Sequence, residues 1–284
     1  MAALARAYGL PAEALQDLGG GNLVVGAGPE YVIKLTPPVF RREIDAEAAV
    51  LTHIGAALPV PVPRLVAHGE WLGWPFVILT RLRGRAIGAC RDSVPAEDMR
   101  ALLRTLGTAL RALHALAAPA CAPGGGWAAF LARESIGCVA RQHAWGVAPA
   151  IVEALPRFLA GAALAPPARS VLLHADLTHE NVLVGQSGGR WKLTGLVDFG
   201  DAMTGDPLFD LITPALLIGR GEPALLAALL DGYGIPPAQR DAALRRRLMA
   251  LAALHRWNDL SRFSRWCGPV TDVEGLSRAL FPLD

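Results

Sequence analysis

The pattern of hydrophobic residues changes near residue 83, and this change limits the folds open to the chain. Before that point, short runs rich in β-branched and apolar residues, such as residues 63–71 and 74–82, alternate with glycine and proline, as strands joined by turns do. The stretch before these two runs carries apolar residues at helical spacing, namely Ile44, Ala48, Leu51 and Ile54. We predict a small sheet with one inserted helix that ends near Leu58, where a proline-rich run begins. The first 18 residues predict another helix, broken at Pro11.

The rest of the chain is rich in alanine and leucine and has a mainly helical pattern. Helical periodicity extends over residues 96–117, 127–144, 148–164 and most of 206–264. A β-rich part followed by a helical part predicts an α+β fold of two lobes. We place these lobes at residues 1–82 and 83–284, with a hinge at about residues 80–84. The cleft between two such lobes is a usual place for small ligands to bind.

Composition and charge exclude several classes of protein. Hydrophobic residues make up 52% of the 284 residues, but the apolar runs are shorter than the roughly 18–20 residues that a membrane span needs. The N-terminus lacks the continuous apolar core of a secretory signal, so we expect a cytoplasmic protein without membrane contact. The net charge of +2 does not favour a nucleic acid partner. The cysteines, Cys90, Cys121, Cys138 and Cys267, form no C-x-x-C pair, so we expect neither a zinc site nor a disulfide framework.

Polar residues interrupt two apolar runs in the stretch VLLHADLTHENVLV, residues 171–184. The segments that follow, VLV, the turn GQSGGR and WKLTGLVDFGD, have the pattern of a β-hairpin. Asn181 begins one arm and Asp198 ends the other, so both are predicted at one edge of the sheet beside Asp176. Oxygen-bearing side chains that converge in this way suit Mg²⁺.

These motifs resemble those of a known family. HADLTHEN is similar to the H-x-D-x-x-x-x-N catalytic loop that protein kinases share with the aminoglycoside phosphotransferase/choline kinase group, and VDFG is similar to their metal-binding D-x-G segment. GDPLFDL, residues 205–211, resembles a segment of the small-molecule kinase branch. The A-P-E motif that closes the activation loop of protein kinases is absent from the sequence. The resemblance covers about residues 15–265 and implies a bilobal, protein-kinase-like fold with a nucleotide-binding N-terminal lobe.

In the C-terminal lobe, the resemblance implies roles for the polar residues of the stretch. Asp176 would accept the proton of a substrate hydroxyl or orient it, and His174 would brace the loop. Asn181 and Asp198 would hold Mg²⁺ on the phosphates of ATP. Asp210 would support the catalytic loop.

In the N-terminal lobe, the resemblance places Lys34 where it would contact the α and β phosphates. Its partner would be a glutamate of the following helix. We prefer Glu47, but Glu43 lies one turn away on the same face and stays open. Read alone, Lys34 fits a solvated strand residue equally well.

Further nucleotide contacts are implied by resemblance. Gly19, Gly20 and Gly21 would let the backbone approach the phosphates, although the G-x-G-x-x-G of protein kinases is absent and the triplet also fits a hairpin connection. The backbone of Thr80 (C=O) and Leu82 (N–H) would contact adenine. On the acceptor side, Glu180 and Asp201 could face substrate. A polycationic acceptor needs an acidic pocket, and the further acidic residues on the expected acceptor side are Asp259, Asp272 and Glu274.

The predicted function is an ATP- and Mg²⁺-dependent phosphotransferase that phosphorylates a hydroxyl group of a small molecule. The acceptor could be an aminoglycoside or aminocyclitol antibiotic or a related metabolite, and GTP is the alternative donor. We expect a monomer or a homodimer. The alternative is a non-catalytic, nucleotide-binding sensor or scaffold. A protein kinase is disfavoured by the missing activation segment, and a metal-dependent hydrolase by the absence of a dense His/Asp cluster from the sequence.

Overall fold

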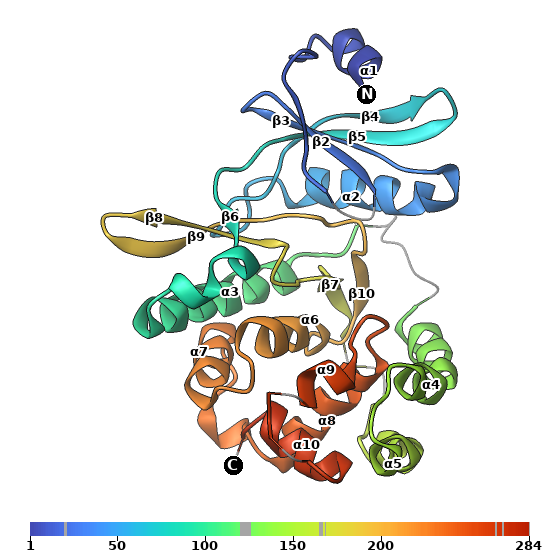
Figure 1. The fold of residues 1–284 in the computed structure, drawn as a ribbon, viewed down its shortest axis with the longest axis vertical. Coiled ribbons are helices and arrows are strands. Elements are labelled where there is room, and N and C mark those ends of the chain that lie inside the picture. The colour runs from blue at the N-terminus through green and yellow to red at the C-terminus, as the bar shows by residue number, and fades with distance from the viewer. Residues whose placement is uncertain are drawn as a thin grey trace.

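The strand patterns of the first 82 residues form one antiparallel sheet (Figure 1). Its strands are β1 (Leu15–Asp17), β2 (Leu23–Ala27), β3 (Tyr31–Leu35), β4 (Leu65–Trp71) and β5 (Trp74–Thr80), in the spatial order β1-β2-β3-β5-β4. The computed structural model describes residues 1–19, 22–119, 126–164, 167, 169–264, 266–268 and 270–283.

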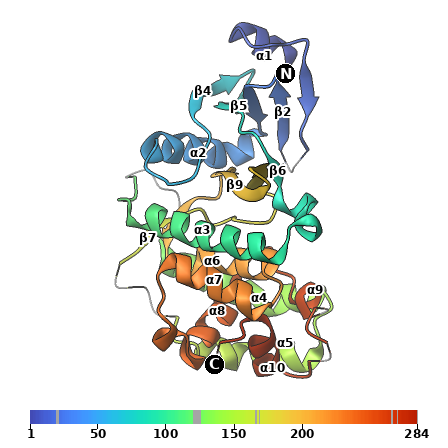
Figure 2. The same ribbon diagram turned by 90° about the vertical axis from the view of Figure 1, so that its left-hand side faces the viewer.

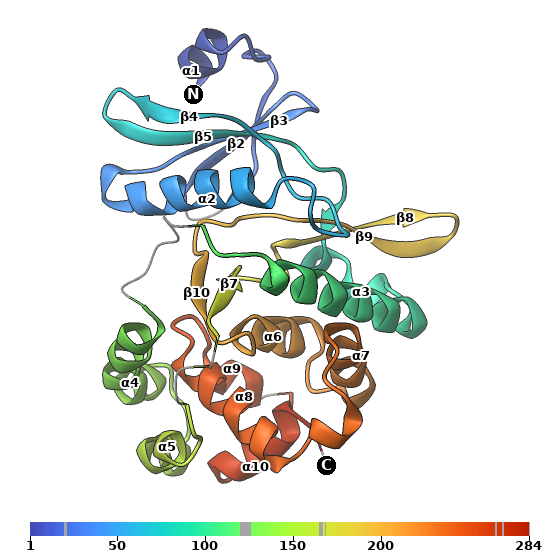
Figure 3. The same cartoon turned by 180° about the vertical axis from the view of Figure 1, so that it is seen from behind.

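Helix α2 (Arg41–Ile54) lies beneath this sheet, on the side that faces the helical lobe (Figures 1 and 3). Its apolar positions, including Ile44 and Leu51, are buried in a core that also contains Val77 and Leu79 of β5. The helix ends at Ile54 rather than near Leu58. Gly55 has a φ of 52°, and glycine adopts this positive φ with little strain, so it stops the helix before the prolines are reached.

The N-terminal segment differs from its predicted form. Helix α1 covers only Ala2–Ala7, and Gly9 follows with a φ of 68°. Leu15–Asp17 is strand β1, which pairs with β2 in the register Leu15↔Ala27. Apolar residues on both sides of Pro11 gave a helical pattern, but pairing with the free edge of β2 decided the conformation of the second half.

The larger hydrophobic core lies mainly in the helical lobe and extends to α2 and β5. The helices of this lobe are α3 (Ala96–Ala115), α4 (Trp127–Ala144), α5 (Pro149–Ala160), α6 (Phe209–Thr213), α7 (Pro223–Tyr233), α8 (Ala242–Leu254), α9 (Leu260–Ser264) and α10 (Val273–Leu280), with a π-helical turn at Pro214–Ile218 after α6. Helices α3 and α7 touch backbone to backbone: a Cβ added at Gly232 would lie 1.9 Å from the Arg104 carbonyl oxygen, and one at Gly107 would lie 2.2 Å from that of Leu229. Only glycine permits this approach.

Short strands lie between the sheet lobe and the helical lobe. Strands β8 (Val182–Ser187) and β9 (Arg190–Leu196) form the predicted hairpin, and β6 (Arg85–Ala86) joins its edge, while β7 (Val171–Leu173) pairs with β10 (Met203–Gly205). The three views agree that the hairpin lies between α2 and α3 (Figures 1, 2 and 3). The Leu196 N–H donates to the Pro61 carbonyl oxygen at 3.0 Å, which ties the hairpin to the sheet lobe. The predicted bilobal α+β fold is confirmed.

Two expectations from composition can be compared with the described residues. Cys90, Cys138 and Cys267 are free thiols, and Cys121 lies outside the described residues. In the part of the chain that the structure describes, no helix is both long and apolar enough to cross a bilayer.

Candidate active site

The loop that follows β7 is held in an unusual backbone conformation by one buried carboxylate. Ala175 has a φ of 66°, in the left-handed region that non-glycine residues seldom adopt. Asp210 of α6 accepts from the N–H of His174 and from the N–H of Ala175, each at 2.8 Å, and from His114 Nε2 at 3.0 Å. Burial opposes the charge of Asp210, but His114 and these donors outweigh it and lower the pKa of the carboxyl. The strained turn is therefore held by a charged group with satisfied hydrogen bonds.

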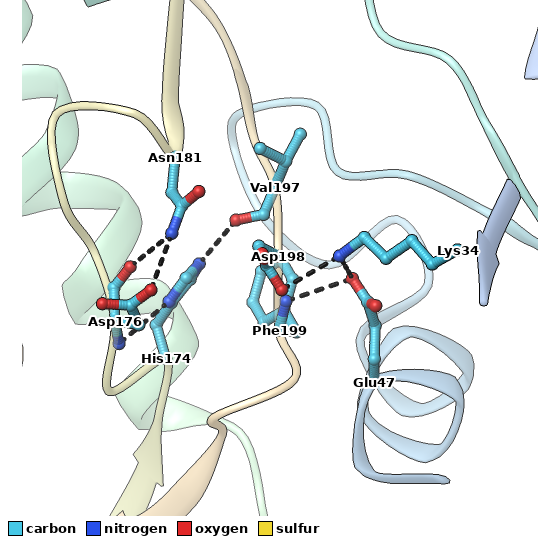
Figure 4. Close-up of polar contacts among 8 residues, drawn as sticks. All are labelled: Lys34, Glu47, His174, Asp176, Asn181, Val197, Asp198 and Phe199. Atoms are coloured by element: carbon cyan, nitrogen blue, oxygen red, sulfur yellow. Dashed lines mark hydrogen bonds and ion pairs between the residues drawn. The ribbon is translucent and has the colours of Figure 1, made fainter. Parts of the chain in front are cut away.

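His174 connects the loop to the segment that precedes Asp198. The ring is fully buried and its Nε2–H donates to the Val197 carbonyl oxygen at 3.1 Å, while Nδ1 accepts from the Asp176 N–H at 3.4 Å (Figure 4). These two bonds fit the neutral ring with its proton on Nε2, and burial lowers the pKa of His174. The ring also packs on Phe199, with centroids 4.4 Å apart. His174 is thus a brace within the loop.

Asn181 orients Asp176 through its amide. Asn181 Nδ2 donates to the Asp176 carbonyl oxygen at 2.8 Å and to Asp176 Oδ2 at 3.0 Å (Figure 4). The amide oxygen of Asn181 therefore points away from these bonds. Burial, and then the charges of Asp201 and Asp198, raise the pKa of Asp176 to about 7. A carboxyl with this pKa can accept a proton near neutral pH.

Lys34, Glu47 and Asp198 form a second cluster across from the loop. Lys34 Nζ donates to Glu47 Oε1 at 2.8 Å and to Asp198 Oδ1 at 2.9 Å (Figure 4). Burial opposes the charge of Lys34, but Glu47 and then Asp198 outweigh it and raise its pKa. Glu47 Oε1 also accepts from the Phe199 N–H at 3.2 Å. The partner of Lys34 in the structure is Glu47, and Glu43 instead lines a neighbouring cavity.

The hairpin brings Asp198 to the loop. The Val197 N–H donates to the Asn181 carbonyl oxygen at 3.0 Å, which continues the β8–β9 pairing. Asp198 has a φ of 68° and its side chain is half exposed. Lys34 outweighs the effect of burial and lowers the pKa of Asp198, so this side chain is an anion with one oxygen held by Lys34.

The oxygen atoms of Asn181 and Asp198 fit a divalent cation. Within the described ranges, no group of three or more histidine, cysteine, aspartate or glutamate side chains could enclose a metal. Mg²⁺ is commonly held by one or two protein oxygens, with water and phosphate oxygens at its other positions. One carboxylate and one amide oxygen beside a lysine are a donor set of this kind.

The described residues among those predicted to contact a nucleotide lie on the sheet lobe and its link. Gly19 has a φ of 72°, and its N–H donates to Asp17 Oδ1 at 2.9 Å. Gly20 and Gly21 lie outside the described residues. Thr80 ends β5, with its hydroxyl accepting from the Arg64 N–H at 2.8 Å. Leu82 lies on the link to β6, beside Gly195 of β9.

A cavity of about 250 Å³ opens beside the loop on the side of Ala175, Gly200 and Asp201. Its lining also includes Val39, Phe40, Arg42, Glu43, Gly126, Phe130, Arg133, Ala202, Met203, Phe209, His255 and Arg256. We call this space the acceptor cavity, after the role that the sequence analysis predicts for this side of the loop. Asp201 lines it and forms an ion pair with Arg256. Glu180, the other carboxylate predicted on this side, is not among the described lining residues and lies 3.4 Å from His179 Nε2.

Sequence reasoning missed the arginines of the acceptor cavity. Arg42 comes from α2, Arg133 from α4 and Arg256 from the segment after α8. Each is a basic residue in a helical pattern, and such residues usually point to solvent. No local signal in the sequence indicates that these segments meet.

The fold and these motifs define the chain as a kinase-like phosphotransferase. A model of the phosphotransferase enzyme family (APH) matches residues 21–251, and the chain belongs to this family. The predicted resemblance is therefore confirmed.

Solved structures share the fold. A GDP complex of an aminoglycoside 2'-phosphotransferase-IIIa mutant has a TM-score of 0.68 at 20% identity, covering 94% of this chain and 90% of that one. A ternary complex of APH(2")-IIa with streptomycin and ATP has a TM-score of 0.64 at 18% identity, covering 88% and 87%. The macrolide 2'-phosphotransferase MphH of Brachybacterium faecium has a TM-score of 0.61 at 24% identity, covering 99% and 97%.

A curated relative is much longer than the matched region. The lysine-specific demethylase JMJ21 of Arabidopsis thaliana is 24% identical over an alignment 207 positions long, and the match covers 57% of this chain. The match spans 22% of that protein's length.

Proposed function

We propose that the chain is a Mg²⁺- and ATP-dependent kinase that phosphorylates a hydroxyl group of a small molecule. One observation carries the proposal: the Lys34, Glu47 and Asp198 cluster faces the Asp176 and Asn181 loop, and the acceptor cavity opens beside both. Membership of the phosphotransferase family supports it. Several neighbours in structure are complexes with GDP, ATP or ADP, which supports a nucleotide as donor, with GTP as the alternative to ATP.

Asp176 is the proposed general base. Asn181 occupies Asp176 Oδ2, and among the described residues no hydrogen bond reaches Oδ1, so Oδ1 is the oxygen open to substrate. It accepts the acceptor's hydroxyl proton while the hydroxyl oxygen forms a bond to the γ-phosphorus. The bond from that phosphorus to the β–γ bridging oxygen breaks, and the nucleoside diphosphate leaves. Asn181 keeps the carboxylate in place, and His174 and Asp210 keep the loop in place, so these residues lower the barrier by positioning.

Lys34 is the proposed contact to the α and β phosphates, and Glu47 fixes its position. Asn181 and Asp198 would hold Mg²⁺. When bound, Mg²⁺ neutralises charge on the phosphate oxygens and holds them in line for transfer. The backbone around Gly19, Gly20 and Gly21 is proposed to cover the phosphates, and the backbone of Thr80 and Leu82 to contact adenine. In this arrangement residues 1–82 bind the nucleotide and residues 83–284 bind the acceptor, with a hinge at about 80–84.

The first test is phosphoryl transfer from Mg·ATP and Mg·GTP to a panel of aminoglycosides, aminocyclitols, amino alcohols, sugars and hydroxy acids. Asp176→Ala serves as the blank. Turnover that disappears in this variant supports a kinase and identifies the acceptor class. Nucleotide binding without turnover on any acceptor favours the sensor or scaffold, which would keep its function in Asp176→Ala. We also propose a cytoplasmic location and a monomeric or homodimeric state, which fractionation and light scattering would check.

A further inference from the structure

The wall of the acceptor cavity carries more cationic than anionic side chains. Arg42, Arg133 and Arg256 line it, whereas the carboxylates on its described lining are those of Glu43 and Asp201. The sequence of residues 120–125, next to the lining residue Gly126, contains no acidic residue. This balance is the opposite of what a polycationic acceptor requires.

The two carboxylates of the wall offer little to a cation. Asp201 already forms an ion pair with Arg256. Burial, and then the charge of Asp201, raise the pKa of Glu43, which disfavours its charged form. An ammonium group in this cavity would therefore meet one carboxylate already paired with arginine and another whose pKa is raised.

Acidic residues near the C-terminal end of the chain do not supply the missing charge. Asp259 accepts from the Ser261 N–H at 2.8 Å, and Asp272 caps α10 by accepting from the Gly275 N–H at 2.7 Å. Glu274 forms an ion pair with Arg246. None of these three lies among the described residues that line the cavity.

Two arginines of the cavity wall are not fully neutralised by neighbouring carboxylates. Arg42 is exposed, and no carboxylate of the described residues forms an ion pair with it. Arg133 Nε lies 3.1 Å from Glu134 Oε1, but Arg141 lies 3.3 Å from Oε2 of the same carboxylate. One carboxylate thus serves two guanidinium groups, and the Arg133 side chain stays 65% exposed. Such groups bind carboxylate or phosphate oxygens in pairs of parallel hydrogen bonds.

Apolar side chains form another part of the wall. Phe130 and Phe209 are in edge-to-face contact with ring centroids 5.3 Å apart, and Phe40 and Met203 lie on the same lining. The Arg133 guanidinium lies 5.5 Å from the Phe130 ring centroid. An acceptor that fits this wall presents an apolar body to the rings and an anionic group to the arginines.

We propose that the acceptor is a small hydroxyl compound with an apolar body and an anionic group, carboxylate or phosphate, bound by Arg42 and Arg133. This inference rests on the proposed function, because it assigns the acceptor of the same site. It separates the acceptor from the polycationic aminoglycosides, which the cavity repels.

The test uses three probes that share a phenyl ring and a hydroxyl and differ in charge: mandelate, mandelamide and 2-amino-1-phenylethanol. Calorimetric titration of the full chain with bound Mg·ADP measures the Kd of each. We expect mandelate to bind about tenfold or more tightly than the amine, since a charge-assisted hydrogen bond has this worth. Arg42→Gln and Arg133→Gln should each weaken mandelate binding about tenfold, and Arg42→Lys should restore part of it.

The matched control is Arg41→Gln. Arg41 is the neighbour of Arg42 at the start of α2, but its guanidinium pairs with Glu70 and does not line the cavity. This variant should leave all three Kd values unchanged. Equal binding of the probes, tighter binding of the amine, or no binding of any probe overturns the inference. So does a loss of Mg·ADP affinity in Arg42→Gln with mandelate affinity unchanged, because Arg42 would then serve the nucleotide.

The same titration tests the proposed nucleotide site and the proposed acceptor separately. If Mg·ADP binds and Asp198→Ala abolishes that binding, the proposed nucleotide site stands whatever the probes do. If Mg·ADP does not bind the full chain, the proposed function fails and the acceptor assignment fails with it. Transfer to kanamycin at a higher kcat/KM than to any hydroxy acid in the panel would refute the anionic acceptor while leaving the kinase intact.

Discussion

The proposed catalytic loop and the acceptor cavity lie side by side but are built in different ways. The loop, its hairpin and Asp198 come from 25 consecutive residues, 174–198, held by backbone pairing and by the buried Asp210. The cavity takes its arginines from α2, α4 and the segment after α8, and the side chains of Arg133 and Arg256 are 65% and 43% exposed. The loop is thus held mainly by hydrogen bonds within and around one stretch of the chain, whereas the proposed choice of acceptor depends on residues that meet only in the folded chain.

The largest effect that could break this comparison is expected at Asp176. Asp176→Asn removes the proposed base but keeps the size of the side chain, so kcat should fall about 10²- to 10⁴-fold for every acceptor. Nucleotide affinity, measured by calorimetry, should change little. A kcat within fivefold of the wild type would mean that Asp176 does not handle the proton.

Asp210→Ala should give the next largest effect. It leaves the His174 and Ala175 N–H groups buried without an acceptor, which we expect to lower the free energy of unfolding by about 3 kcal/mol. Because the loop is then free to relax, kcat should also fall in a variant that remains folded at low temperature. Urea titration and steady-state kinetics check both outcomes. Asp210→Asn retains one accepting oxygen, so its free energy of unfolding and its kcat should lie between those of the wild type and those of Asp210→Ala.

Glu43 and Glu47 lie one turn apart on α2 and sharpen the comparison. Glu47 contacts Lys34, whereas Glu43 lines the acceptor cavity. Glu47→Gln weakens the ion pair with Lys34 and should raise the KM for ATP about tenfold. Glu43→Gln should leave that KM within twofold and alter only the KM for the acceptor. Opposite results, with ATP affected by Glu43→Gln, would contradict the pairing seen in the structure.

The smallest effect concerns pH. The base form of Asp176 increases as pH rises through its pKa of about 7, so kcat/KM should rise through this range. Arg256 lowers this pKa, and Arg256→Gln should therefore move the midpoint upward. An unchanged midpoint in Arg256→Gln would show that the two regions are not coupled electrostatically.

Asp176 should also make the free energy of unfolding of the nucleotide-free protein depend on pH. Its ordinary pKa is 3.8, so between about pH 4 and 7 the folded chain holds a proton that the unfolded chain has released. Stability from Asp176 is therefore present at low pH and is lost as pH rises towards 7, with a slope of up to about 1.4 kcal/mol per pH unit. Asp176→Asn should lack this slope, and parallel urea titrations across the range would show it.

More of the loop and its hairpin than of the acceptor cavity could be predicted from the sequence. The catalytic loop and hairpin could be predicted because a turn and two strands place nearby residues together with little choice. The Lys34–Glu47 contact needed the helix face to be resolved between two glutamates, which periodicity alone does not do. The cavity arginines could not be predicted, since their meeting depends on how α2, α4 and α8 pack. The N-terminal helix was extended too far because pairing with an edge strand overrides a short helical pattern.

Glu47 Oε1 accepts from Lys34 within the sheet lobe and from the Phe199 N–H beyond the hairpin. A movement that separates α2 from the segment after the hairpin must break the bond from the Phe199 N–H to Glu47. The Phe199 amide is then exposed to water. The exchange rate of a single backbone proton therefore records how often the molecule opens. Slower deuterium uptake at Phe199 in the presence of Mg·ATP would measure, in solution and at one atom, how strongly the nucleotide clamps the layers together.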